Sequence, residues 1–273
     1  MLLGTSSPLK HATPQEWAAR HVSLGLGSVV FPVDHLAGEE TVEAYRRAAE
    51  EAGLVIAEVG IWKNTLSADP KERKEATEYA IGQLKMADRI GAKCCVNVLG
   101  TPYGPRWDGG YRDNFSDEAW ELAVAKVREI IDAVRPSRTR FSIESMPWMI
   151  PSGPDEYLEL VERVDRDELG VHLDVVNMVT SPDRYFFNDR FLHECFSKLH
   201  GRILSCHLKD VRLLPDYTFQ LQECACGEGS LDIPLYVRLA ESENPDMPMI
   251  IEHLADDDAY EASIRYLDGL LSR

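Results

Sequence analysis

The chain has 273 residues, of which 44% are hydrophobic, 27% charged and 8% aromatic, a composition typical of a globular protein with a well-filled core. Its formal net charge is −17. Such a charge repels nucleic-acid phosphates and anionic membranes, and the sequence contains no basic patch to override it. We therefore expect neither a nucleic-acid nor a membrane partner.

The sequence also argues against membrane insertion, secretion and a disulfide scaffold. No apolar run approaches the roughly 18 residues of a membrane span, and the N-terminal segment lacks a signal-peptide pattern. The six cysteines form no CxxC pair, so neither a disulfide framework nor a structural zinc site is expected. We expect a cytoplasmic protein.

Short β-like runs alternate with amphipathic helical stretches along the chain. The expected strands are Leu2 to Thr5, Leu24 to Phe31, Leu54 to Ile61, Cys94 to Leu99, Arg140 to Ser145, Gly170 to Val175, Ile203 to Leu208 and Met249 to His253. The first expected helix has Thr13 as its cap and Pro14 in its first turn. The others span Thr41 to Ala52, Pro70 to Ile90, Asp117 to Val134, Pro154 to Val164, Asp189 to Leu199, Ile233 to Glu241 and Asp258 to Leu271.

This alternation, without a linker or a composition shift, predicts a single α/β domain over residues 1–273, a (β/α)8 TIM barrel. A doubly wound open sheet is the alternative, but "GTSSP" after the first strand is not the glycine-rich loop that this fold favours. Two long connections, Gly100 to Ser116 and Arg212 to Leu231, follow the C-terminal ends of strands, which form the catalytic face of a barrel. Their length is typical of lids or binding loops.

Four expected strands end on acidic or imidazole side chains, namely Glu144, Asp174, His207 and Glu252. The first two intervals are each about one βα unit of roughly 31 residues, so these side chains come from consecutive strands at similar depth. Converging carboxylates repel one another unless a cation compensates them. Three oxygens and an imidazole suit Mn²⁺, with Mg²⁺ and Co²⁺ as alternatives. The competing interpretation is that each residue only caps its strand or pairs with a neighbour.

The motifs "SIESMPW", "LDVVN", "CHLKD", "GEGSLDIP" and "IIEH" make the chain resemble the xylose isomerase-like superfamily of sugar isomerases and epimerases. Within that superfamily the chain is similar to the group of ketose 3-epimerases, hydroxypyruvate isomerases and inosose dehydratases. The resemblance implies that Glu144, Asp174, His207 and Glu252 bind one divalent metal, and that Glu144 and Glu252 also move protons. Members of this group are often dimers or tetramers, so the resemblance is compatible with a homo-oligomer.

The same chemistry follows from the residue types. A carboxylate that acts as a base can remove a proton next to a sugar carbonyl, which gives an enediolate. A metal bound to the substrate oxygens stabilises the negative charge of this enediolate. Two carboxylates on opposite faces would epimerise a ketose or related keto-sugar, whereas one alone would isomerise it. Loss of a hydroxyl from a keto-cyclitol or 3-keto-glycoside would instead make the enzyme a lyase. A non-catalytic sugar-binding barrel is a further alternative. An abasic-site endonuclease is disfavoured, because Asn177 stands where that enzyme would have a histidine and the net charge opposes DNA.

Five further residues are candidates for binding the carbohydrate substrate: Glu58, Trp62, Asn177, Lys209 and Arg212. Each has a plainer alternative, since Trp62 could pack, Asn177 could form a turn, Lys209 could form a salt bridge at the rim, and Arg212 could be solvated. His172 is expected to be an interior histidine. Gly227 and Gly229 could bring backbone N–H groups to a phosphate. Because no basic cluster lies nearby, a non-phosphorylated substrate is expected.

Overall fold

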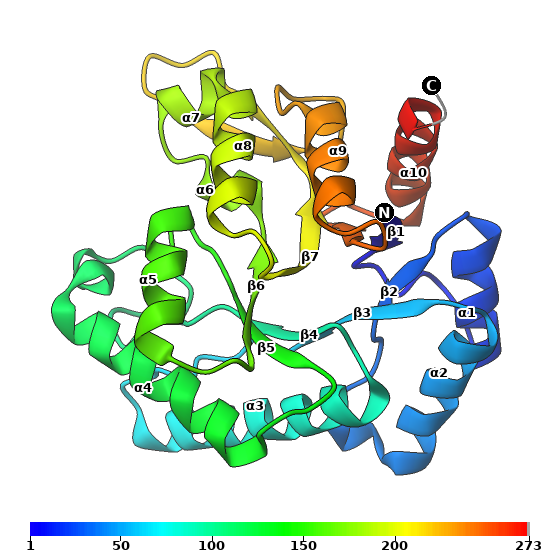
Figure 1. The fold of residues 1–273 in the computed structure, drawn as a ribbon, viewed down its shortest axis with the longest axis horizontal. Coiled ribbons are helices and arrows are strands. Elements are labelled where there is room, and N and C mark those ends of the chain that lie inside the picture. The colour runs from blue at the N-terminus through cyan, green and yellow to red at the C-terminus, as the bar shows by residue number, and fades with distance from the viewer. Residues whose placement is uncertain (272–273) are drawn as a thin grey trace.

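The structure is a computed structural model that describes residues 1–271. Its central sheet has eight parallel strands, hydrogen-bonded in the order β1-β10-β7-β6-β5-β4-β3-β2 (Figure 1). They are β1 (Leu2–Thr5), β2 (Ser28–Val30), β3 (Val55–Gly60), β4 (Cys94–Asn97), β5 (Arg140–Glu144), β6 (Leu169–Leu173), β7 (Ile203–Leu208) and β10 (Pro248–Ile251). The sheet curls into a nearly closed barrel, which confirms the predicted (β/α)8 fold.

The first and last strands in this order, β1 and β2, meet along a seam. The Gly27 backbone N–H donates to the Leu3 carbonyl at 2.9 Å, and the Ser28 hydroxyl donates to the Leu2 carbonyl at 3.0 Å. A Cβ on Gly4 would come within 2.7 Å of the Ser28 carbonyl oxygen. Only glycine therefore lets the two strands approach closely enough to complete the barrel.

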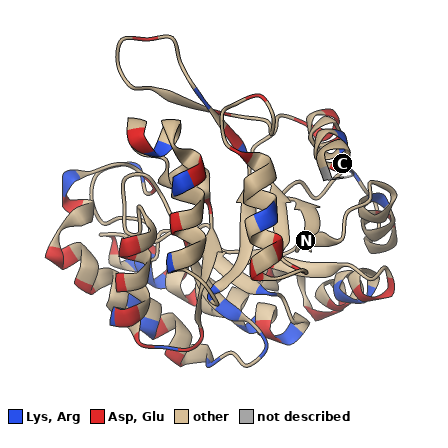
Figure 2. Cartoon of the chain, turned by 45° about the horizontal axis from the view of Figure 1, so that its top comes forward, with Lys and Arg blue, Asp and Glu red and all other residues tan. Residues whose placement is uncertain are grey.

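Helices cover the outside of the barrel, and most charged residues lie on them and on the connecting segments (Figure 2). The helices that follow barrel strands are α1 (Pro14–Ser23), α2 (Glu39–Glu51), α3 (Pro70–Ile90), α4 (Asp117–Val134), α5 (Pro154–Val164), α8 (Asn188–Lys198), α9 (Ile233–Glu243) and α10 (Asp257–Leu271). The predicted signals for helix starts and helix ends are present in the structure. The Thr13 hydroxyl accepts from the Glu16 N–H at 3.1 Å, and α3 ends at Gly91, whose φ is +74°.

Strand alternation separates the apolar core from the polar interior of the barrel. In β5, Phe141 and Ile143 belong to the hydrophobic core, whereas Ser142 and Glu144 are buried polar residues. Because successive side chains point to opposite faces, Ser142 and Glu144 share the face away from the helices and lie one above the other. The barrel interior is therefore built of polar layers near its C-terminal end.

The structure contains short elements that sequence patterns did not predict. The second strand is shorter than expected, because α1 is followed by a turn through Gly25 with φ +73°. The strand before Asp174 ends at Leu173, since Asp174 caps the short helix α6 (Val175–Met178), which α7 (Pro182–Phe186) follows. Two 3-10 turns, η1 (His35–Ala37) and η2 (Arg112–Phe115), lie in connections. The long connection after β7 contains a hairpin of β8 (Asp210–Leu213) and β9 (Leu221–Cys224).

The "GEGS" segment is organised by a buried carboxylate. Asp210 is 1% exposed and accepts from the backbone N–H groups of Gly227, Gly229 and Leu231 at 2.9–3.0 Å, and from that of Val211 at 2.8 Å. A Cβ on Gly229 would lie 2.3 Å from Asp210 Oδ1. The two glycine N–H groups thus bind a carboxylate of the chain itself, and the predicted role in approaching a phosphate is wrong.

Replacing Asp210 should test how strongly this carboxylate holds the connection after β7. Asp210→Ala leaves four backbone donors without their charged acceptor, so we expect the free energy of unfolding to fall by roughly 3 kcal/mol. Asp232→Ala is the control, because Asp232 only caps α9 through the Leu235 N–H, at a cost of about 1 kcal/mol. Urea denaturation measures both. Equal losses of unfolding free energy in the two variants would contradict the role of Asp210 in holding the connection after β7.

Candidate metal centre and active site

Four polar side chains meet at the C-terminal ends of neighbouring strands. Glu144 ends β5, Asp174 follows β6, His207 lies near the end of β7 and Glu252 follows β10. One ligand atom from each lies within 4.8 Å of the others. All four residues are at most 5% exposed. The residues predicted from the strand ends are therefore brought together in space.

The imidazole of His207 is the centre of this group. Its Nδ1 lies 3.0 Å from Glu252 Oε1, 3.3 Å from Glu144 Oε1 and 3.4 Å from Asp174 Oδ2. One nitrogen carries at most one proton and cannot donate to three oxygens at once. Three carboxylate oxygens and an imidazole nitrogen at these spacings fit the donor set of a divalent cation such as Mn²⁺, Mg²⁺ or Co²⁺.

A buried ammonium group compensates part of the negative charge. Lys209, 2% exposed, places its Nζ 2.6 Å from Glu252 Oε1 and 2.7 Å from Asp174 Oδ2. Burial lowers the pKa of Lys209, but Asp174 and Glu252 outweigh burial and raise it well above its usual value. Lys209 therefore stays charged. His207 also contacts both of these carboxylates, and His253 contacts Glu252.

The ionisation of the centre is strongly shifted by its environment. Burial raises the pKa of Glu144 to about 7, despite the opposing effect of His207. Burial lowers the pKa of His207, but Glu252, Glu144 and Glu58 outweigh burial and hold it well above its usual value. In the absence of a metal ion, Glu144 and His207 thus keep protons that a metal must displace before it can bind.

Neighbouring groups fix the orientation of the candidate ligands. Asp174 Oδ1 accepts from the Asn177 backbone N–H at 3.0 Å, which leaves Oδ2 to face His207 and Lys209. The Asn177 side-chain amide donates to Glu144 Oε1 and to the Ser145 carbonyl, both at 3.1 Å. The helix cap after β6 therefore positions two of the four ligands.

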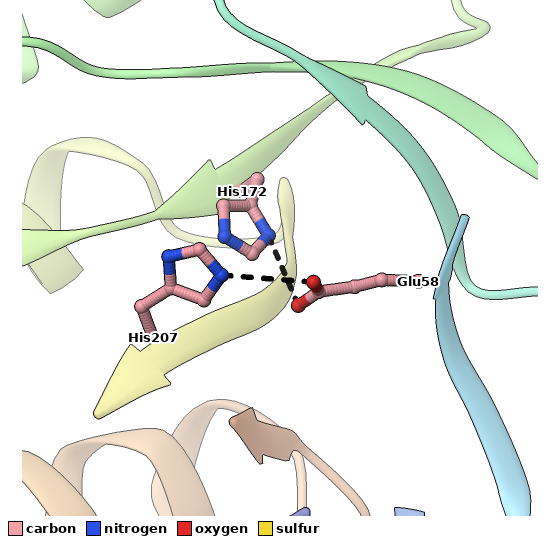
Figure 3. A group of neighbouring side chains, drawn as sticks. All are labelled: Glu58, His172 and His207. Atoms are coloured by element: carbon pink, nitrogen blue, oxygen red, sulfur yellow. Dashed lines mark ion pairs between the residues drawn. The ribbon is translucent and has the colours of Figure 1, made fainter. Parts of the chain in front are cut away.

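A second polar layer lies beneath this group. Glu58 from β3, His172 from β6 and Ser205 from β7 are each at most 1% exposed. The rings of His172 and His207 both face the Glu58 carboxylate (Figure 3), with Nδ1 of His172 at 3.4 Å and Nε2 of His207 at 3.6 Å. Burial raises the pKa of Glu58, but His172, His207 and Ser205 outweigh burial and lower it. Glu58 is therefore a carboxylate enclosed in the barrel.

A cavity of about 530 Å³ opens at two of the four candidate ligands. Glu144 and Glu252 both line it, so the two carboxylates are reachable by a small molecule. Three tryptophans also line it, at positions 62, 107 and 148. Aromatic faces beside a carboxylate pair are suited to the C–H faces and hydroxyl groups of a sugar.

The five residues predicted to bind substrate lie in different places. Trp62 and Asn177 line the cavity. Lys209 contacts the candidate metal ligands from within the barrel. Glu58 does not line the cavity, because it stands two residues before Gly60 at the end of β3 and so lies one layer deeper. Arg212 also lies outside the cavity, since it pairs with Gln222 across the exposed β8–β9 hairpin and donates to its amide oxygen.

Sequence patterns missed several residues of the cavity wall. Glu223 on β9 and His253 both line it, and His253 Nδ1 lies 2.7 Å from Glu223 Oε1. His253 directly follows Glu252 in "IIEH", which was a usable signal. Glu223, Trp107 and Trp148 lie in irregular connections or in the hairpin, where no periodic pattern indicates direction.

Comparison with known proteins gives the family. Residues 18–270 match the family model described as xylose isomerase-like TIM barrel, and the chain belongs to this family, which confirms the resemblance predicted from its motifs. A search of curated proteins finds no match. Among residues 1–271, no helix is both long and apolar enough to cross a membrane.

Solved structures share the fold at low sequence identity. D-psicose 3-epimerase with D-tagatose from Clostridium cellulolyticum H10 is 15% identical with a TM-score of 0.72, covering 100% of this chain and 99% of its own. A xylose isomerase-like TIM barrel protein from Mycobacterium smegmatis in complex with magnesium is 19% identical, at TM-score 0.70 and coverages of 100% and 96%. A probable 3-DHS dehydratase from Bacillus anthracis is 14% identical, at TM-score 0.73 and coverages of 98% and 99%.

Removing the buried ammonium group should destabilise the metal-free protein. Lys209→Met leaves Asp174 and Glu252 without their cation, and we expect the free energy of unfolding to fall by about 3–5 kcal/mol in the presence of a chelator. Added Mn²⁺ should recover part of this loss. Lys198→Met, which breaks two ion pairs on the surface, should cost less than about 1 kcal/mol. A Lys209 variant as stable as wild type would contradict the role given to this lysine.

Metal affinity should depend on pH through the protons held in the centre. Glu144, with its pKa of about 7, is largely protonated below that pH, and binding must displace its proton. The affinity for Mn²⁺ should therefore rise between pH 6 and pH 8, with proton release detectable by calorimetry in buffers of different ionisation enthalpy. Glu144→Gln should release fewer protons. An affinity independent of pH would show that the centre holds no such proton.

Proposed function

We propose that this chain is a divalent-metal-dependent sugar isomerase or epimerase that acts through an enediolate on a ketose or related keto-sugar. Mn²⁺ is the proposed metal, with Mg²⁺ and Co²⁺ as alternatives, bound by Glu144, Asp174, His207 and Glu252. The observation that carries the proposal is that two glutamates of this ligand set also line the cavity. Residues 1–273 are proposed to form one catalytic TIM-barrel domain.

The proposed chemistry is divided between the cation and the side chains. When bound, the cation would stabilise the negative charge that develops on the carbonyl oxygen of the substrate. Glu144 and Glu252 would act as base and acid at carbon, each taking or returning a proton. Carboxylates on opposite faces of the substrate invert a carbon, whereas a single carboxylate that moves a proton between neighbouring carbons isomerises it.

The cavity also supports a neutral, non-phosphorylated substrate. Arg106 at its wall pairs with Asp108 at 2.7 Å, and His253 pairs with Glu223. These cationic groups are already engaged with carboxylates, so a phosphate would have to compete for them. Trp62 would stack on the sugar, and Asn177 would bind a hydroxyl while it holds Glu144.

A lyase is the second candidate, and the position of His253 favours it. Its Nε2 lies 3.4 Å from Glu252 Oε2, and the ring lines the cavity. An N–H donor beside the base could assist the departure of a hydroxyl group from the same enediolate. The structural relative described as a probable 3-DHS dehydratase shows that a member of this fold is assigned to that class of reaction.

The two glutamates should be indispensable for turnover. Glu144→Gln and Glu252→Gln should each lower kcat by about 100- to 10,000-fold, because an amide cannot accept a proton from carbon. The assay follows ketoses, keto-cyclitols and 3-keto-glycosides by NMR in D₂O with Mn²⁺. Deuterium gained at the reacting carbon without loss of water supports epimerisation or isomerisation, whereas an enone or diketone supports the lyase.

The control for this experiment is Glu162→Gln, which changes an exposed glutamate on α5 and should leave kcat unchanged. Full turnover in both active-site variants would contradict the two-base mechanism. Binding of a sugar without turnover by wild-type protein that carries its metal would instead support a non-catalytic barrel.

A further inference from the structure

The buried layer beneath the candidate metal centre needs an explanation. Glu58 is an enclosed carboxylate that faces two imidazoles, and it lies outside the cavity (Figure 3). Burying a carboxylate is costly unless it is paired or hydrogen-bonded. His207 links the layer to the candidate centre, because its Nδ1 faces the candidate ligands and its Nε2 faces Glu58.

The hydrogen bonds within the layer have a single consistent direction. The Glu58 carboxylate can only accept, and Ser205 Oγ donates to its Oε1 at 3.0 Å. The one hydroxyl proton of Ser205 is then used, so the 2.6 Å contact with His172 Nδ1 requires His172 to donate. His172 therefore carries its proton on Nδ1 and holds Ser205 toward Glu58.

The same reasoning applies to the proton of His207. To bind a cation through Nδ1, this nitrogen must present its lone pair, so the remaining proton must stay on Nε2. Nε2 faces Glu58 Oε2 at 3.6 Å, a distance at which the attraction is electrostatic rather than a direct hydrogen bond. Once a cation has displaced the proton from Nδ1, the negative charge of Glu58 favours keeping the remaining proton on Nε2, and the lone pair of Nδ1 faces Glu144, Asp174 and Glu252.

We propose that Glu58, held in place by Ser205 and His172, is a positioning residue that keeps the proton of His207 on Nε2 and so leaves Nδ1 free to bind the metal. This inference rests on the proposed function, because it assumes that the four-residue centre binds a cation. A carboxylate behind a metal-binding histidine orients the ring and raises its basicity, and loss of such a partner costs about 10- to 100-fold in metal affinity.

A second cation among Glu58, His172 and His207 is the competing interpretation, since their ligand atoms also lie within 4.8 Å of one another. A neutral imidazole has one lone pair, so His207 could bind cations on both sides only by losing both of its protons. The hydrogen-bond direction already assigns Nδ1 of His172 to Ser205. The two buried groups that share His207 are therefore predicted to bind one cation between them.

Calorimetric titration of the metal-free full chain with Mn²⁺ tests this proposal. Wild type should bind one Mn²⁺, and Glu58→Leu should bind it about 10- to 100-fold more weakly. Glu58→Gln keeps an acceptor oxygen without the charge and should lose less. The matched control is Ser142→Ala, because Ser142 is a buried polar residue of the barrel interior whose hydroxyl has no hydrogen-bond partner among residues 1–271. Its affinity should equal that of wild type.

A spectroscopic measurement separates positioning from a general effect on folding. In protein labelled with ¹⁵N-histidine and saturated with Mg²⁺, Nε2 of His207 should give the resonance of a protonated nitrogen in wild type and in Ser142→Ala. Mg²⁺ on Nδ1 keeps the proton on Nε2 in every variant, so the expected change in Glu58→Leu, or in Glu58→Gln should the first variant fold poorly, is a shift of this N–H resonance caused by loss of the facing carboxylate. An unchanged resonance together with an unchanged Kd would overturn the proposal.

The remaining outcomes separate this inference from the proposed function. Two Mn²⁺ per wild-type chain, with one lost in Glu58→Leu, would replace the positioning role by a second metal site. Equally tight binding of one Mn²⁺ by wild type and by Glu58→Leu would contradict the positioning role of Glu58 and leave the proposed function intact. Absence of Mn²⁺ binding by wild type would overturn both the inference and the proposed metal dependence.

Discussion

The compensation of buried negative charge is the constraint on which the site depends. Three carboxylates meet around the imidazole of His207, and the ammonium group of Lys209 lies against two of them. Such a group is tolerable in a barrel interior only when cations balance it. Lys209 and a protonated His207 can do so without metal, and a divalent cation does so more completely once the proton of Glu144 and the Nδ1 proton of His207 have left.

The barrel arranges the surroundings of this charge in layers. Parallel strands bring their C-terminal ends to one face, and alternation places every second side chain inside. Beneath the centre, the layer of Glu58, His172 and Ser205 faces the rear nitrogen of His207. Above it, tryptophans and the β8–β9 hairpin form a cavity that gives a sugar-sized molecule access to Glu144 and Glu252.

Sequence patterns predicted the barrel and the four residues at its strand ends, because strand order, βα spacing and alternation depend on local periodicity. They placed Glu58 at the substrate pocket, whereas it lies one layer deeper, enclosed by His172 and Ser205 from other strands, and such contacts between strands are set by the closed barrel. They could not orient Arg212 or find Glu223, since both belong to a hairpin whose register is set by cross-strand pairing rather than by the barrel. The partners of Gly227 and Gly229 were equally unpredictable, because Asp210 reaches them through tertiary folding.

The central claim is that these four side chains bind one divalent cation. Diffraction from crystals grown with Mn²⁺, recorded near the manganese absorption edge, tests it most directly. The account predicts one anomalous peak per chain, at about 2.0–2.3 Å from an oxygen of Glu144, Asp174 and Glu252 and from Nδ1 of His207. A map without a peak there at saturating Mn²⁺ would contradict it.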